Sequence, residues 1–163
     1  PLFEGTRIMP FKLKEQAFSW FKYIDREPPL NTQFDLYYLC LLIGLISGKS
    51  DSPGQSQDFV GHFVDGYYPY RRIIAGLLLH TELKHFGIAL SESDEIKQKI
   101  ELLLSSSDNM LTKDGFDKLN SYASGGFNII CAVIIDKPRN TAEFLLQYSN
   151  LLKSEMSKST IWK

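Results

Sequence analysis

The residues best suited to chemistry form the run YYPYRR at positions 67–72, which the sequence pattern places at the start of a long helix. Two arginines in a first helical turn oppose the helix dipole, which favours anions at that end. Free backbone N–H groups and the guanidinium groups of Arg71 and Arg72 could converge on a phosphate. The hydroxyls or ring faces of Tyr68 and Tyr70 would add contacts typical of nucleic-acid sites. We therefore predict a phosphate-binding site here. The alternative is that the arginines pair with carboxylates while the tyrosines pack in the core.

A second group, Asp58, His62 and Asp65, precedes this run. Its spacing puts the three side chains on one face of a helix predicted over 58–66. Two carboxylates and an imidazole could hold Mg²⁺ or Mn²⁺ and activate a water for phosphodiester hydrolysis, so these residues are candidate catalytic and metal ligands. The solvent face of an amphipathic helix gives the same pattern. We favour that interpretation, because polar faces greatly outnumber metal sites.

The sequence carries no other motif of a familiar enzyme class. His80 and His85 are five positions apart and do not share a helix face, so they do not form a zinc motif. Walker A, G-x-G-x-x-G and G-x-S-x-G patterns are absent. NTP hydrolysis, nicotinamide chemistry and serine hydrolysis are therefore unsupported.

The composition is that of an ordinary globular chain of 163 residues, 44% hydrophobic, with a net charge of -1. At roughly 100–200 residues per domain, we predict one domain over 1–163, with flexible ends at 1–10 and 154–163. Because the net charge is nearly zero, a basic site must be a local patch. Cys40 and Cys131 lie in apolar runs, as expected for reduced, buried thiols of a cytoplasmic protein. No run approaches the ~20 apolar residues of a membrane span, so we expect no membrane association.

Hydrophobic periodicity predicts an all-α fold, a single-domain bundle of six or seven helices. A helix is predicted over 12–25, and the apolar run within 31–47 is typical of a central helix rather than a strand. Another helix covers 70–86 with Gly87 as its C-cap, and one opens at Ser91. The remaining predictions are a helix capped by Thr112, a break or kink at Gly125-Gly126, an apolar stretch over 127–135 that suits helix or strand, and a helix over 141–153 capped by Asn140.

Three stretches together resemble a known family: FDLYYLCLLIGLISG (34–48), FVGHFVDGYYPYRRIIAGLLL (59–79) and LTKDGFDKLNSYASGGF (111–127). They are similar to the small helical proteins of bacterial DNA phosphorothioation systems, which act beside a sulfur-transfer machinery in antiphage defence. In those systems the small subunit is described as binding nicked DNA or making the nick.

The resemblance implies DNA and the other subunits of the modification system as partners. It also implies that Arg71 and Arg72 contact phosphates and that Asp58, His62 and Asp65 are candidates for nicking. The overall acidity departs from the pattern expected of a DNA-binding protein. A homo-oligomer that aligns one basic strip per subunit would reconcile the two.

A non-enzymatic alternative is a helical adaptor that docks a larger modification enzyme or an ATPase. Aromatic residues and arginine are the usual anchors of protein interfaces, so the YYPYRR run could serve a protein partner instead. Further candidates for an exposed aromatic surface are Trp20, Phe21 and Tyr23 near the N-terminus and Trp162 near the C-terminus.

Overall fold

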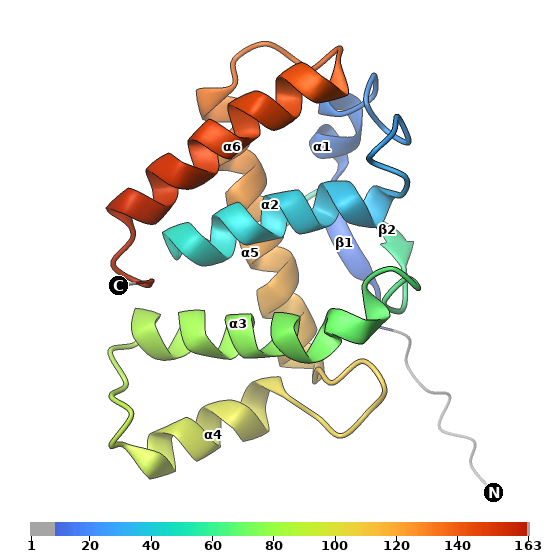
Figure 1. Cartoon of the computed structure of the whole chain (residues 1–163). Coiled ribbons are helices and arrows are strands. Elements are labelled where there is room, and N and C mark those ends of the chain that lie inside the picture. The colour runs from blue at the N-terminus through green and yellow to red at the C-terminus, as the bar shows by residue number, and fades with distance from the viewer. Residues whose placement is uncertain (1–8, 163) are drawn as a thin grey trace, which may run out of the picture.

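The computed structural model describes residues 9–162, which form six α-helices and one small sheet (Figure 1). The prediction of a mostly helical fold is confirmed. In chain order the elements are β1 (Phe11–Lys14), α1 (Glu15–Trp20), α2 (Gln33–Ser47), β2 (Ser56–Val60), the 3-10 turn η1 (Tyr68–Tyr70), α3 (Arg71–His85), α4 (Ser93–Leu103), α5 (Lys113–Val133) and α6 (Thr141–Lys158).

The two strands replace segments that we predicted as helical, so all-α is wrong as a description of the whole fold. β1 pairs antiparallel with β2, and α1 retains only the middle of the helix predicted over 12–25. In β1 the buried side chains of Phe11 and Leu13 alternate with half-buried lysines, which is the period of a strand. Phe11 packs edge-on against aromatic rings of α2, α5 and the turn after β2. Its place in this aromatic core outweighs the helical pattern of the residues that follow.

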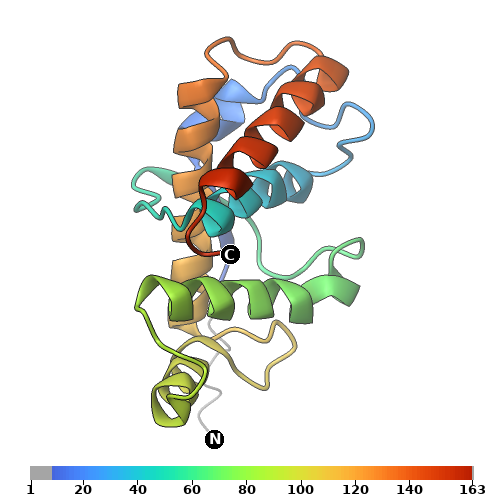
Figure 2. The same cartoon turned by 60° about the vertical axis from the view of Figure 1, so that its left-hand side comes forward.

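The helices are arranged around α5, which runs down the molecule past α2 to the level of α3 in both views (Figures 1 and 2). α2 crosses α5 near its middle, and α6 packs beside α2. α3 lies on the other side of α2, and α4 packs against α3 and against the beginning of α5. None of the helices in residues 9–162 combines the length and the apolarity that crossing a bilayer requires.

The crossing of α2 and α5 is built on glycines. A Cβ on Gly126 would overlap the carbonyl oxygen of Cys40, and a Cβ on Gly44 would overlap that of Tyr122. A Cβ on Gly125 would overlap the carbonyl oxygen of Lys49, in the loop that follows α2. Of the predicted break or kink at Gly125-Gly126, the break is wrong, because these glycines bring two backbones together within one continuous helix. The same helix includes 127–133, the stretch for which the sequence left helix or strand open.

Most of the predicted helix ends are confirmed. The Thr112 hydroxyl accepts from the N–H of Gly115, and Asn140 accepts from two N–H groups in the first turn of α6. Gly87 takes a positive φ after α3, and the N–H groups of Gly87 and Ile88 donate to the carbonyls of Lys84 and Leu83, a Schellman motif. The start predicted at Ser91 is two residues early, because α4 begins at Ser93 without a side-chain cap.

The predicted flexible end at 154–163 is instead part of the packed fold as far as the structure describes it. α6 continues to Lys158, and Ile161 is buried. The Trp162 ring stacks on His80, with 4.3 Å between ring centroids, and its Nε1 donates to the carbonyl of Leu45 at 3.2 Å. Of the other predicted end, 1–10, residues 1–8 lie outside the described part of the chain.

The polar loop after α2 is fastened to two other elements by Asp51. Its Oδ2 accepts from Lys14 Nζ at 2.6 Å and from Asn128 Nδ2 at 2.7 Å, and Lys14 Nζ also donates to Asn128 Oδ1 at 2.9 Å. Hydrogen bonds from these two side chains hold the pKa of Asp51 below its usual value. The loop is thereby tied to β1 and to α5.

The glycine crossing gives the first prediction. We expect Gly126→Ala to lower the free energy of unfolding by about 3 kcal/mol or more, because neither backbone can withdraw without opening the core. The matched control is Gly76→Ala on the exposed side of α3, where a Cβ meets no atom within 4 Å. Alanine favours a helix over glycine by up to about 1 kcal/mol, so the control should be neutral or stabilising. Urea unfolding followed by circular dichroism measures both, and equal stabilities would contradict the tight crossing.

The second prediction concerns the Asp51 carboxyl group. Its folded pKa lies below its unfolded value, so its contacts stabilise the fold above the unfolded pKa of about 3.9, and this contribution is lost as the pH falls through the folded pKa. We expect Asn128→Ala to raise the pKa of Asp51, as measured by carboxyl ¹³C NMR titration. Asn150→Ala, on the exposed side of α6, is the control and should leave that titration unchanged.

Candidate anion-binding surface at the start of α3

The predicted phosphate-binding residues lie where η1 leads directly into α3. The tyrosine that precedes them, Tyr67, belongs to the core: its ring packs on Phe34, and its hydroxyl donates to Asp35 Oδ1 at 2.5 Å. Burial and this hydrogen bond raise the pKa of Tyr67. Tyr67 therefore fixes the direction in which the next residues leave the core.

Tyr68 and Arg71 form one preassembled unit. The Arg71 guanidinium lies over the Tyr68 ring, 3.9 Å from its centroid, and Nη1 donates to the Tyr68 carbonyl at 2.8 Å. The Tyr68 hydroxyl donates to Asp108 Oδ1 at 2.7 Å, and this contact raises the pKa of Tyr68. The ring and the guanidinium are thus held in place before any ligand arrives.

Neither arginine is neutralised by a neighbour. Within residues 9–162, no carboxylate lies within ion-pair distance of Arg71 or Arg72. Arg72 and Tyr70 are exposed, and Arg71 is half-buried. The structure of residues 9–162 therefore does not match the alternative, in which the arginines pair with carboxylates while Tyr68 and Tyr70 pack in the core. Two uncompensated cations beside exposed aromatic rings suit an anionic ligand.

The backbone contributes less to this surface than the sequence suggested. The N–H groups of Tyr67, Tyr68 and Tyr70 donate to carbonyls of the preceding residues, and the N–H of Arg71 donates to the Tyr68 carbonyl within η1. The sequence predicted free N–H groups at the start of the helix, but those of Tyr70 and Arg71 are not free, because the 3-10 turn uses them.

Asp58, His62 and Asp65 do not share a helix face, because the predicted helix over 58–66 does not form. Asp58 lies in β2 opposite Lys12, with 3.9 Å between Oδ1 and Nζ, whereas His62 lies in a bend and Asp65 in a turn. All three are exposed. Among the described residues, no three His, Cys, Asp or Glu side chains come together as metal ligands.

The aromatic residues suggested for an adaptor surface divide into two groups. Trp20 and Phe21 are buried and pack on rings of α5 and α6, so the expectation that they are exposed is wrong. Tyr23 is exposed, and Trp162 is half-buried against His80. The exposed apolar side chain nearest in sequence to the arginines is Ile73, which follows them on α3.

The sequence did not single out Glu82, which is the one charged residue with no exposed surface among the described residues. Glu82 lies on α3 with no exposed surface, at the end of the apolar series Ile74, Leu78, Glu82 with steps of four. The sequence offered one signal for it: a carboxylate stands on the apolar face of a predicted helix. Because an unpaired buried charge is costly, such a carboxylate implies polar partners.

The comparisons with known proteins add no relative. No family model, curated protein or solved structure matches this chain. What the chain's fold and site define is thus a mostly helical protein with an exposed surface of arginine and tyrosine where α3 begins.

Proposed function

We propose that this protein binds the sugar–phosphate backbone of DNA through Tyr68, Tyr70, Arg71 and Arg72. The observation that carries the proposal is the pair of arginines without a carboxylate partner in the described part of the chain, next to exposed tyrosines. Arginine forks match phosphate oxygens, and such contacts position a protein on DNA without reading its sequence. Binding should therefore depend strongly on salt and weakly on sequence.

The four side chains would contact DNA in different ways, according to how exposed each one is. Arg72 and Tyr70 are free to contact a phosphate and a sugar or base directly. Arg71 is already oriented by the Tyr68 ring and carbonyl, so less side-chain freedom is lost when it meets a phosphate. A preassembled cation and an exposed cation side by side suit neighbouring phosphates of one strand.

The setting of the surface favours weak binding by one chain. The net charge is -1, and Asp108 lies beside Tyr68. A homo-oligomer that presents one such surface per subunit would multiply the phosphate contacts, and we include this assembly in the proposal. The resemblance to the small subunits of phosphorothioation systems supports DNA as the polymer and makes nicked and phosphorothioated duplexes the informative probes.

The nicking activity suggested by the sequence has less to support it. Its candidate residues, Asp58, His62 and Asp65, lie on a strand, a bend and a turn rather than on one helix face. Nicking with Mg²⁺ or Mn²⁺ stays a prediction that a plasmid-relaxation assay tests directly. Relaxation that persists in Asp58→Asn would exclude that residue as a required metal ligand.

The third prediction tests the phosphate contacts. We expect replacing Arg71 and Arg72 together by Gln to weaken binding to all duplexes and to reduce the slope of log K against log salt by up to about two, because up to two counterion-releasing contacts are lost. Fluorescence anisotropy with intact, nicked and phosphorothioated duplexes measures this. The matched control is Arg139→Gln, which removes an exposed arginine before α6. An unchanged slope in the double variant would contradict the proposal.

The adaptor function is the second candidate, and the exposure of Ile73 next to the arginines favours it. An apolar side chain beside Arg and Tyr is the composition of a protein-binding hot spot. No DNA binding at low salt, together with salt-insensitive association with a co-expressed subunit of the modification system, would favour the adaptor over DNA binding.

A further inference from the structure

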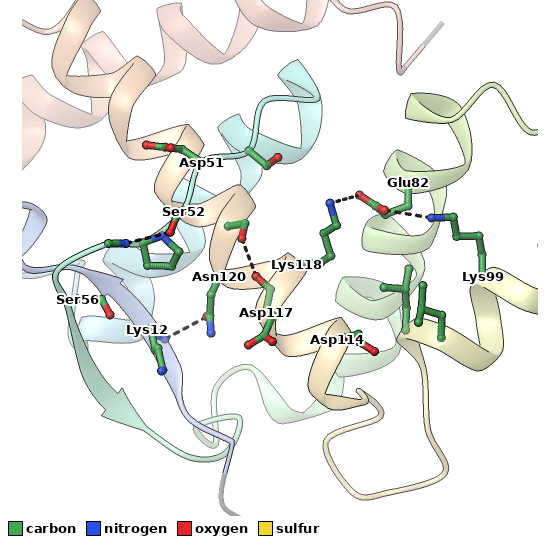
Figure 3. Close-up of a pocket in the computed structure, with 16 residues that line it drawn as sticks. Lys12, Asp51, Ser52, Ser56, Glu82, Lys99, Asp114, Asp117, Lys118 and Asn120 are labelled. Carbon is green, nitrogen blue, oxygen red and sulfur yellow. Dashed lines mark hydrogen bonds and ion pairs between the residues drawn. The ribbon is translucent and has the colours of Figure 1, made fainter.

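A cavity of about 730 Å³ lies on the side of α5 that faces α3, α4 and the loop before β2 (Figure 3). Its volume falls within the range of small-molecule sites. Its lining is mostly charged and hydroxyl-bearing, and it includes none of the four residues of the proposed DNA surface. The cavity is lined by Lys12, Ser50, Asp51, Ser52, Pro53, Gly54, Ser56, Glu82, Lys99, Leu102, Leu103, Asp114, Asp117, Lys118, Asn120 and Ser121.

The buried carboxylate of Glu82 forms one wall of this cavity. Its Oε1 accepts from the Tyr122 hydroxyl at 2.6 Å, and this contact together with burial raises the pKa of Tyr122. Its Oε2 has no hydrogen-bond partner among the described residues, although Glu82 has no exposed surface. One side of the carboxylate is thus anchored, and the other lacks a donor.

Two lysines approach the carboxylate without reaching hydrogen-bond distance. Lys99 Nζ lies 3.6 Å from Oε2, and Lys118 Nζ lies 3.8 Å from Oε1. Figure 3 shows them reaching toward Glu82 from opposite sides, Lys99 from α4 and Lys118 from α5. Lys99 is also held over the Phe86 ring, 3.7 Å from its centroid. The three charged groups therefore leave acceptor capacity on the carboxylate and donor capacity on both ammonium groups.

A hydroxyl group satisfies both needs at once, because it donates one hydrogen bond and accepts others. Because Oε2 has no exposed surface, a hydroxyl reaches it only when the Lys99 side chain moves aside; the hydroxyl would then accept from the ammonium and donate to the carboxylate. A second hydroxyl on the adjacent carbon would occupy the equivalent place beside Lys118. We propose that this cavity binds a small ligand that carries a vicinal diol, such as the ribose of a nucleotide or a free sugar.

The rest of the lining adds charged and hydroxyl-bearing groups around Glu82. The carboxylates of Asp51 and Asp117 are compensated by Lys14 and Lys113, which lie outside the lining. Lys12 pairs with Asp58, and Asp114 adds a further carboxylate to the lining, so Lys99 and Lys118 are the lysines that face Glu82. Hydroxyls of Ser50, Ser52 and Ser56 line the loop side and offer further hydrogen bonds.

This site is independent of the proposed DNA surface. A deoxyribose in DNA has no vicinal diol, so the cavity would not read the DNA backbone by this contact. Failure of one proposal leaves the other intact, and replacing Arg71 and Arg72 should not affect binding in the cavity.

The test is amide NMR of the full chain titrated with AMP and with 2′-deoxy-AMP, which lacks the diol. We expect AMP to shift the amides around Lys99, Lys118 and the loop 50–56, and 2′-deoxy-AMP to bind at least about tenfold more weakly. Methyl riboside shows which kind of ligand supplies the diol. Binding comparable to that of AMP indicates a free sugar, and much weaker binding than that of AMP indicates a nucleotide. Equal binding of both nucleotides, equal binding of inorganic phosphate, shifts confined to 67–73, or no shifts up to about 10 mM AMP would each overturn the proposal.

Variants connect the binding to the buried carboxylate. Glu82→Gln keeps the acceptor for Tyr122 but removes the charge, and we expect at least about tenfold weaker AMP binding. Because this change in the core could impair folding, Lys99→Gln at the partly exposed rim is the second variant, with the same expectation. Its matched control is Lys97→Gln on the exposed side of α4, outside the cavity. Equal affinities of Lys99→Gln and Lys97→Gln would overturn the proposal.

Discussion

The fold depends on the direct contact of two helix backbones where α2 crosses α5. Gly44 and Gly126 leave no space for a side chain between the helices, so the register of α5 against α2 is fixed at this point, and Gly125 packs as closely on the loop after α2. Polar side chains on the preceding turns of α5 are placed by that register. The Asn120 amide accepts from the Tyr37 hydroxyl on α2 and from the backbone of β1, and the Tyr122 hydroxyl reaches Glu82. Close packing of backbones thus sets the geometry of hydrogen bonds a full turn or more away.

α3 connects the two candidate sites and gives each a different face. Its buried stripe ends in Glu82, which belongs to the cavity beside α5, whereas its first turn carries Arg71 and Arg72 toward solvent. The two sites differ in electrostatics. The arginines are cations with no carboxylate partner in residues 9–162, and Glu82 is a buried anion between two lysines. A cation at the surface retains its hydration, but a buried carboxylate depends on the groups that surround it.

What the sequence predicted well was local. The central apolar helix within 31–47, the helix over 70–86 and the cap at Asn140 depend on residues within a few turns of one another, and the structure confirms them. The segment 58–66 was mistaken for a helix because β2 is stabilised by pairing with β1, a distant partner that periodicity does not reveal. The same limit applies to Glu82, whose importance depends on lysines from α4 and α5.

The end of α2 is completed by Thr81 of α3 and by Ser159 and Trp162, which follow α6. The carbonyl of Leu45 accepts from Thr81 and from Trp162 Nε1, and the carbonyl of Ile46 accepts from the Ser159 hydroxyl. These are carbonyls that a helix leaves open at its C-terminus. Ser159 and Trp162, distant in sequence, thus cap the C-terminal end of the central helix α2. A fusion partner or label joined directly after α6 would act on the core of the protein rather than on a loose end.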